Sequence, residues 1–164
     1  MPTGRLADQI TYPQRLPSPL SEEDKAKLSA IAEKVKLSYL IEREGLETFS
    51  ETFDRTFSLG EQQRLNVARV FWHKPRFACL DECTSAVALD GEEEIYEQIS
   101  KIDCTVLTAS QKPWLTNYHS ASLELTADGK GGWSHSEITE EKKFKGQVRL
   151  DEKAYVDKRQ GRAT

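Results

Sequence analysis

Between residues 76 and 110 the chain carries two short apolar runs with a helical pattern between them. The runs are RFACL (76–80) and CTVLTAS (104–110), and both are typical of buried strands. The helical pattern follows Asp90, a suitable N-cap residue, and its apolar stripe is formed by Ile95, Ile99 and Ile102. A strand, a helix and a second strand predict a parallel pair joined by a helical crossover. This order constrains the chain to an α/β fold.

Helical patterns also come before this unit. We expect helices at 22–36 (with Ser21 in a capping box), at 37–44 (closed by Gly45) and at 61–73 (stopped by Pro75). The apolar stripe of the last one is Leu65, Ala68 and Phe71, widened by Val67 and Val70. The proline-rich residues 1–20 and the segment leading to Phe57 are predicted to be irregular. SASLELTA (120–127) and GGWSHSEI (131–138) predict an antiparallel hairpin.

The composition is that of a soluble globular chain, and it excludes some functions. The net charge is −4, which supplies no basic face for nucleic acid. No stretch of 18 apolar residues exists, and the first residues do not form a signal peptide. Cys79, Cys83 and Cys104 are an odd number of cysteines without metal-ligand spacing. We therefore expect a soluble, intracellular chain with buried free thiols.

Two adjacent carboxylates, Asp81 and Glu82, follow the first apolar run directly. Open α/β sheets bind ligands at the carboxyl ends of their strands. An Asp at such an end is suited to hold Mg²⁺, and a neighbouring Glu is suited to orient a water for attack on a phosphoryl group. An ordinary strand that ends in an acidic turn is the alternative interpretation.

A serine and a glycine, Ser58 and Gly60, come just before the predicted helix at 61–73. Free backbone N–H groups and the helix dipole at such a start favour an anion such as phosphate. A plain serine N-cap without a ligand is the alternative, and it is far more common.

Taken together, these segments resemble the ATP-binding cassette (ABC) ATPases. The resemblance rests on FSLGEQQR (57–64), Ala68-Arg69, Pro75 and LDECTSA (80–86), which match the signature-to-Walker B block of that family in order and spacing. The wording DECTSAV, with TNYH and GGW further on, is closest to subfamily D, the peroxisomal half-transporters for fatty acids and acyl-CoA and their bacterial relatives. TGRLADQITYP resembles the segment just after the Q-loop. The resemblance extends to about Ile138 and implies a partial P-loop NTPase fold: a helical subdomain, an incomplete parallel sheet and a C-terminal hairpin.

The resemblance also implies roles for individual residues. Ser58, Leu59, Gly60 and Glu61 would form the signature loop, which faces the nucleotide held by a partner cassette. Asp81 would be the Walker B carboxylate that serves Mg²⁺, and Glu82 the catalytic glutamate. The D-loop, which crosses the dimer interface, would be Ser85, Ala86, Val87 and Ala88. Gln111 would stand where the family has its switch histidine.

Several parts of the family pattern are absent or altered. No glycine begins the P-loop pattern GxxxxGK[ST], so the segment that grips ATP is expected elsewhere. Leu59 replaces a glycine, which requires a negative φ there, and Ala88 replaces the D-loop aspartate. Gln111 can hydrogen-bond a phosphate oxygen but supplies no charge. In the family the P-loop strand would lie beside the Walker B strand, so its absence predicts an unpaired sheet edge and an uncovered face.

We therefore expect three segments. Residues 1–70 would hold the post-Q-loop segment, the helical subdomain and the signature helix, residues 71–138 the Walker B, D-loop and switch half, and residues 139–164 a flexible charged tail. The first interpretation is an ATPase half that is inactive alone and works with ATP, Mg²⁺, a second cassette and transmembrane domains. It would be associated with a membrane through the full transporter, and the resemblance implies the peroxisomal membrane. The second is a degenerate, non-catalytic cassette that acts as an interaction module. A third, a cassette of the chromosome or DNA-repair type, is disfavoured by the acidic charge.

Overall fold

The computed structural model describes residues 1–126 and 129–144. The chain divides into two compact units, Met1–Ala109 and Ser110–Thr164, which are considered one at a time. Their boundary follows chain packing, whereas the three segments expected from the sequence follow motif content. That functional division therefore stays a prediction.

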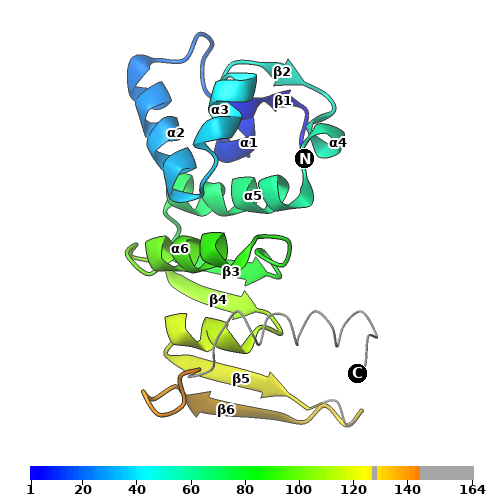
Figure 1. Cartoon of the computed structure of the whole chain (residues 1–164), viewed down its shortest axis with the longest axis vertical. Helices are drawn as coiled ribbons and strands as arrows, with labels where there is room; N and C mark the ends of the chain where they lie inside the picture. The colour runs from blue at the N-terminus through cyan, green and yellow to red at the C-terminus, as the bar shows by residue number, and fades with distance from the viewer. Residues whose placement is uncertain (127–128, 145–164) are drawn as a thin grey trace. The chain divides into compact units, whose positions relative to one another are not determined.

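The first unit begins with a helical region held together by one long helix (Figure 1). Its elements are β1 (Gly4–Arg5), α1 (Leu6–Thr11), α2 (Glu22–Lys34), α3 (Ser38–Glu44), β2 (Phe49–Ser50), α4 (Phe53–Thr56) and α5 (Leu59–His73). The three helices predicted from periodicity are confirmed as α2, α3 and α5. The bounds differ slightly, since α2 ends at Lys34 and α5 begins at Leu59.

Two segments predicted to be irregular contain short elements. β1 and α1 lie within residues 1–20, and β2, paired antiparallel with β1, and α4 lie before Phe57. Helix α1 spans six residues and α4 four, too few to show a helical period. Local hydrogen bonds stabilise α1 instead, because the carboxylate of Asp8 accepts from the backbone N–H of Arg5 (2.8 Å) and pairs with its guanidinium.

Helix α5 is the centre of the helical core and packs against α1 and α2. Its predicted apolar stripe is buried, with Leu65, Ala68 and Phe71 all at most 3% exposed. Val67 is also buried, whereas Val70 is half-buried. Lys74 ends the helix in a left-handed conformation just before Pro75, as the sequence predicts.

Next come β3 (Phe77–Asp81), α6 (Leu89–Ile99) and β4 (Thr105–Ala109), and the two strands pair in parallel. The strand–helix–strand prediction is therefore confirmed. Helix α6 begins after Ala88, so Asp90 lies in its first turn and the prediction that it is the N-cap was wrong. A hydrogen bond links Tyr96 of α6 to Thr108 of β4, which ties the helix to the sheet.

The β3–β4 sheet has two strands in the described part of the chain, so each strand has an unpaired outer edge. Exposure alternates along β3: Leu80 is buried, while Phe77 and Cys79 are exposed. Leu107, opposite Cys79 in register, is 66% exposed. The predicted uncovered face is thus present. Cys79 lies on it, so the prediction that Cys79 is buried was wrong. Cys83 and Cys104 are partly exposed free thiols.

The second unit contains a 3₁₀ helix, η1 (Pro113–Tyr118), followed by the strands β5 (Ala121–Leu125) and β6 (Trp133–Glu137). The two strands pair antiparallel, which confirms the predicted hairpin. The predicted charged tail is described only as far as residue 144, and residues 145–164 lie outside the described part. Among the described residues, no helix combines the length and apolar character needed to cross a bilayer.

Candidate functional site

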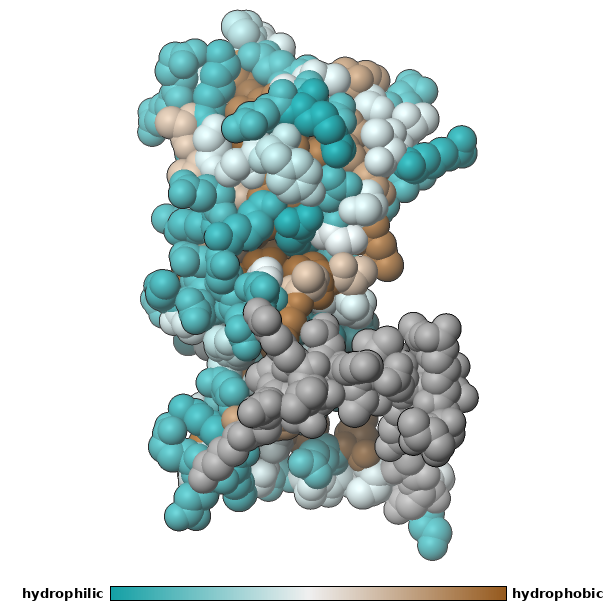
Figure 2. Space-filling view, in the orientation of Figure 1, coloured by the Kyte–Doolittle hydropathy of each residue, from teal (hydrophilic) through white to brown (hydrophobic). Residues whose placement is uncertain are grey.

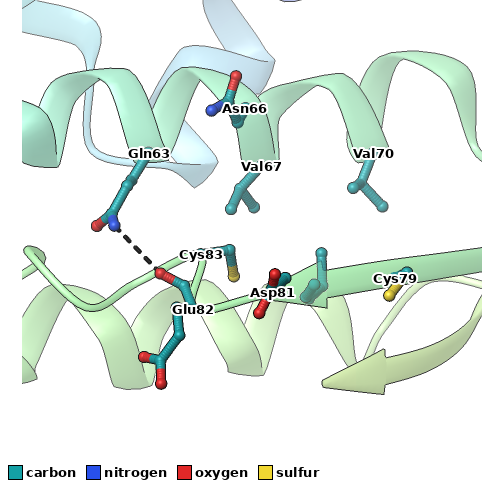
Figure 3. Close-up of a pocket in the computed structure, with 9 residues that line it drawn as sticks. Gln63, Asn66, Val67, Val70, Cys79, Asp81, Glu82 and Cys83 are labelled. Carbon is teal, nitrogen blue, oxygen red and sulfur yellow. Dashed lines mark hydrogen bonds between the residues drawn. The ribbon is translucent and has the colours of Figure 1, made fainter. Parts of the chain in front are cut away.

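The two predicted carboxylates lie where β3 ends. Asp81, its last residue, is exposed, and Glu82 is half-buried at the carboxyl edge of the sheet. Glu82 has a left-handed backbone with φ of 44°, a conformation that is uncommon for residues other than glycine. Its backbone N–H donates to Ala109 O (3.0 Å), so pairing with β4 continues one residue beyond the strand. Figure 3 shows the Glu82 side chain directed away from α5.

Gln63 of α5 connects this turn to the helix. Its Nε2 donates to the carbonyl of Glu82 (3.1 Å, Figure 3) and to Oγ of Ser85 (2.8 Å). Its Oε1 accepts from the backbone N–H of Ala86 (2.8 Å). One side chain thus holds three points of the turn that follows β3.

A second close approach lies one helical turn earlier on α5, at Gly60. A Cβ on this residue would come within 2.8 Å of the carbonyl oxygen of Ala86. Only glycine allows the first turn of α5 to approach the backbone of residue 86 so closely. The structure therefore brings together two predicted motif segments, 58–61 and 81–88, which lie more than 20 residues apart in the sequence.

Ser58 is the N-cap of α5, as the alternative interpretation from the sequence describes. Its hydroxyl accepts from Glu61 N (3.3 Å), and the Glu61 carboxylate accepts from Ser58 N (2.7 Å), which makes a capping box. Leu59 and Gly60 are therefore not a loop before the helix but its first turn. Leu59 is 61% exposed and is not among the residues with positive φ, so it meets the backbone requirement stated for it.

Glu61 has more partners than the capping box. The second oxygen of its carboxylate accepts from the hydroxyl of Tyr39 (3.0 Å) and from the guanidinium of Arg43 (3.3 Å). Burial alone would raise the pKa of Glu61, but the hydrogen bonds from Ser58 and Tyr39 and the charge of Arg43 outweigh it and hold that pKa below its usual value. One oxygen of Glu61 thus caps α5, and the other anchors the start of α5 to α3.

The segment that follows Glu82 alternates between exposed and buried residues. Ser85, Ala86 and Ala88 are exposed, and Val87 is buried. Thr84 is buried and donates to the buried carboxylate of Glu92 in α6. The turn is therefore held to α6 through Thr84 and to α5 through Gln63, while Ser85, Ala86 and Ala88 remain exposed.

Gln111 is the one predicted site residue outside the first unit. It is exposed and follows β4 in the second unit, so the structure assigns it no position relative to Glu82. Sequence reasoning did not single out three residues of the site, namely Gln63, Tyr39 and Arg43. Gln63 lies within the quoted FSLGEQQR stretch, whereas no sequence signal connects Tyr39 or Arg43 to Glu61.

Groups able to bind a metal or ligand are few in the described part of the chain. No three His, Cys, Asp or Glu residues there cluster in a way that would hold a metal ion. A surface groove of about 350 Å³ runs between α5 and β3, with Gln63, Val67 and Val70 on the helix side and Asp81 and Glu82 on the strand side (Figure 3). Asp81 can offer one hard oxygen ligand, so a cation here would need its other ligands from a bound molecule.

The parallel strand–helix–strand unit and the helical region before it define a partial α/β fold. Comparison with known families identifies it further. The family model described as "ABC transporter" matches residues 3–85, about half of the chain. The chain therefore belongs to the ABC transporter family.

Curated relatives place it near subfamily D. "ATP-binding cassette sub-family D member 1" of Drosophila melanogaster is 38% identical over 148 residues, covering 90% of this chain and 20% of the relative. "ABC transporter D family member 1" of Arabidopsis thaliana is 39% identical over 153 residues, covering 79% of this chain and 11% of the relative. The chain thus spans a fifth or less of the length of these two proteins.

Among solved structures, "Structure of a bacterial Atm1-family ABC exporter with ATP bound" superposes with a TM-score of 0.57 at 21% identity. The match covers 72% of this chain and 20% of the exporter chain. It supports the fold alone: this chain has a partial cassette fold.

Proposed function

We propose that this chain is the C-terminal half of an ABC transporter nucleotide-binding domain. In this role it contributes the signature loop, the Walker B carboxylate and the catalytic glutamate to ATP hydrolysis that drives transport. The observation that carries the proposal is the contact between the first turn of α5 and the turn after Glu82, through Gln63 and Gly60. This contact holds the proposed signature segment against the turn that follows the proposed catalytic glutamate.

Glu82 is the proposed catalytic residue. It ends a parallel strand, its carboxylate is not enclosed by packed side chains, and its backbone is fixed by Ala109 on one side and Gln63 on the other. A carboxylate carried on a backbone held in this way can accept a hydrogen bond from water and orient it for attack on a phosphoryl group. Ser58 and Gly60 would contact the phosphates of the nucleotide held by the partner cassette.

Membership in the family implies ATP, and Asp81 fits the role of carboxylate for Mg²⁺. It is exposed at the end of β3 next to Glu82 and provides an oxygen ligand, which a hard cation requires. When bound, Mg²⁺ would neutralise charge on the phosphates. The phosphate oxygens of the nucleotide would supply further hard ligands.

The P-loop segment is proposed to come from outside these 164 residues and to complete the β3–β4 sheet. Phe77, Cys79 and Leu107 form an exposed face there, and the strand edges are unpaired in the described part. Parallel sheets are normally covered on both faces by other elements. A P-loop strand with its helix would pair with this sheet and bury that face.

The partners would be a second cassette and transmembrane domains, and no nucleic acid. The D-loop residues Ser85 to Ala88 would contribute to the interface with the second cassette. Fatty acids or acyl-CoA as cargo, and the peroxisomal membrane as location, are suggested by likeness to subfamily D alone.

A second candidate function is a non-catalytic cassette that offers its signature surface to a partner subunit. The sequence favours it at Gln111, since glutamine cannot supply the proton or positive charge of the family's histidine.

ATPase assays on a reconstituted cassette distinguish the two functions. This chain is combined with a P-loop half and a competent partner cassette, and ATP turnover is measured for wild type, Glu82→Gln and Ser58→Arg. Loss of turnover in both variants supports the catalytic role. Loss with Ser58→Arg alone supports the non-catalytic role. Glu97→Gln, an exposed glutamate in α6, is the matched control and should turn over ATP like wild type.

A further inference from the structure

Gln63 is the residue in the described structure that joins α5 to the turn after β3 at several points at once. Its two amide hydrogens are both used, toward Glu82 O (3.1 Å) and Ser85 Oγ (2.8 Å), and its oxygen accepts from Ala86 N (2.8 Å). A side-chain amide is the uncharged group that supplies both donors and an acceptor here. The fit of glutamine to this set of partners is therefore specific.

Two of the three bonded groups are backbone atoms, Glu82 O and Ala86 N, and the third is the hydroxyl of Ser85. Glu82, whose carbonyl accepts from Gln63, has a strained, left-handed backbone conformation. Ala86, whose N–H donates to Gln63, lies in the exposed part of the turn. Strained residues at functional sites persist when surrounding contacts determine them. The bond from Gln63 to the Glu82 carbonyl is one such contact, and the pairing of Glu82 N–H with Ala109 is another.

We propose that Gln63 is a positioning residue that makes the start of α5 and the turn from Glu82 to Ala86 one rigid surface. The functional role of this surface rests on the proposed function. A partner cassette that contacts Ser58 and Gly60 would set the orientation of Glu82 in the same chain as those two residues. Gly60 supports the inference independently, since a Cβ at this position would lie only 2.8 Å from Ala86 O and the two segments are therefore in close contact there as well.

Two substitutions separate the bonds that Gln63 makes. Gln63→Met keeps the length of the side chain and removes all three hydrogen bonds. Gln63→Glu keeps the acceptor for Ala86 N–H and for the hydroxyl of Ser85, but it cannot donate to the Glu82 carbonyl. Gln62→Met is the matched control, because Gln62 also donates twice to backbone carbonyls, of Asp54 (3.0 Å) and Phe57 (2.9 Å), away from the turn.

The measurement is backbone NMR with amide hydrogen exchange on the full chain without nucleotide. In Gln63→Met we expect the Ala86 amide to exchange faster on the order of tenfold, with α5 amides unchanged. In Gln63→Glu we expect the Ala86 amide shift to be kept while the carbonyl-carbon shift of Glu82 moves. Gln62→Met should leave both signals as in wild type.

The difference in exchange between the Ala86 amide and the α5 amides distinguishes a positioning role from general stabilisation. Loss of general stabilisation would speed amide exchange in α5 and in the turn together. Ala86 exchange within twofold of wild type in Gln63→Met overturns the proposal, and so does equal acceleration across α5. If Gln63→Met does not fold, Gln63→Glu decides. A change in both the Ala86 amide shift and the Glu82 carbonyl-carbon shift, or in neither, would contradict the proposal. The NMR measurement needs no ATP, so it tests the rigid surface separately from the proposed function. If the Gln63 variants give the expected NMR changes while Glu82→Gln leaves ATP turnover unchanged, that result counts against the proposed function and not against the rigid surface.

Discussion

The helical region and the β3–β4 sheet, both in the first unit, differ in how completely they bury their apolar side chains. In α5, Leu65 is 1% exposed and Phe71 is 3% exposed, because α1 and α2 pack against that helix. In the sheet, Phe77 is 65% exposed and Leu107 is 66% exposed. Figure 2 shows hydrophilic side chains over most of α2 and α3, and hydrophobic ones at the surface where α5, α6 and β3 meet.

The difference shows which region of the chain buries its apolar side chains within itself. Helices α1, α2, α3 and α5 pack against one another within the first 73 residues. A parallel sheet needs cover on both faces, and in the described residues one face of β3–β4 remains open. The predictions below test this contrast by substituting matched positions in the two regions.

The largest effect is expected at the centre of the helical core. Leu65→Ala removes a fully buried side chain between α5 and its neighbours, which costs about 2–5 kcal/mol of stability. Urea unfolding followed by circular dichroism measures this loss. A loss of no more than about 0.5 kcal/mol, the usual range for surface substitutions, would mean that the helical region is not the well-packed part of the chain.

A smaller effect is expected at the start of α5. Glu61→Gln removes a buried charge that accepts from Ser58, Tyr39 and Arg43, and hydrogen bonds to charged groups contribute about 1.5–3 kcal/mol. Because the pKa of Glu61 is lowered in the folded state, its contribution is complete above the unfolded value near 4.5 and is lost as the pH falls through the folded pKa. Stability curves of both proteins against pH should therefore converge in acid. Parallel curves would contradict this role.

The next effect concerns the close contact of α5 with the turn. Gly60→Ala gains about 1 kcal/mol of helix propensity, but its Cβ would meet the backbone carbonyl of Ala86 at 2.8 Å, and overpacking costs about 1–3 kcal/mol. We expect a net loss of stability and a shifted Ala86 amide signal. Gly91→Ala in α6 is the control, since its Cβ meets only a side-chain methyl of Val87 at 3.3 Å. Equal effects of the two substitutions would show that the contact at Gly60 is loose.

The smallest effect is expected on the open face of the sheet. Leu107→Ser should change the free energy of unfolding by no more than about 0.5 kcal/mol, because the side chain is already in water. Leu80→Ser, on the covered face, is the matched comparison and should destabilise strongly. A large loss with Leu107→Ser would mean that another segment covers this face. Solubility should rise in Leu107→Ser, since it reduces an exposed apolar patch.

Periodicity was enough to predict the long elements and their order. The isoleucines Ile95 and Ile99 of α6, the stripe of α5 and the two apolar runs define a strand–helix–strand unit after a helical region, and the structure confirms that unit. Ile102, the third residue of the predicted stripe, lies beyond the end of α6 at Ile99. The prediction for Cys79 failed because an apolar run was taken to be buried on both faces. Whether the second face is covered depends on segments elsewhere in the cassette, which the run itself does not specify. The short α1 and α4 were missed because fewer than two helical turns show no period.

The sequence by itself determined the class of the protein through its resemblance to a known family, because the order and spacing of motif residues along the chain are local properties. Residues 57–64 and 80–86 carry that information without any reference to folding. Only the tertiary structure decided that these segments touch, through Gln63 and Gly60, and that Glu61 faces Tyr39 and Arg43. The physical reason is that contacts between residues more than about 20 positions apart are set by how helices and strands pack together, and no period along the chain records that packing.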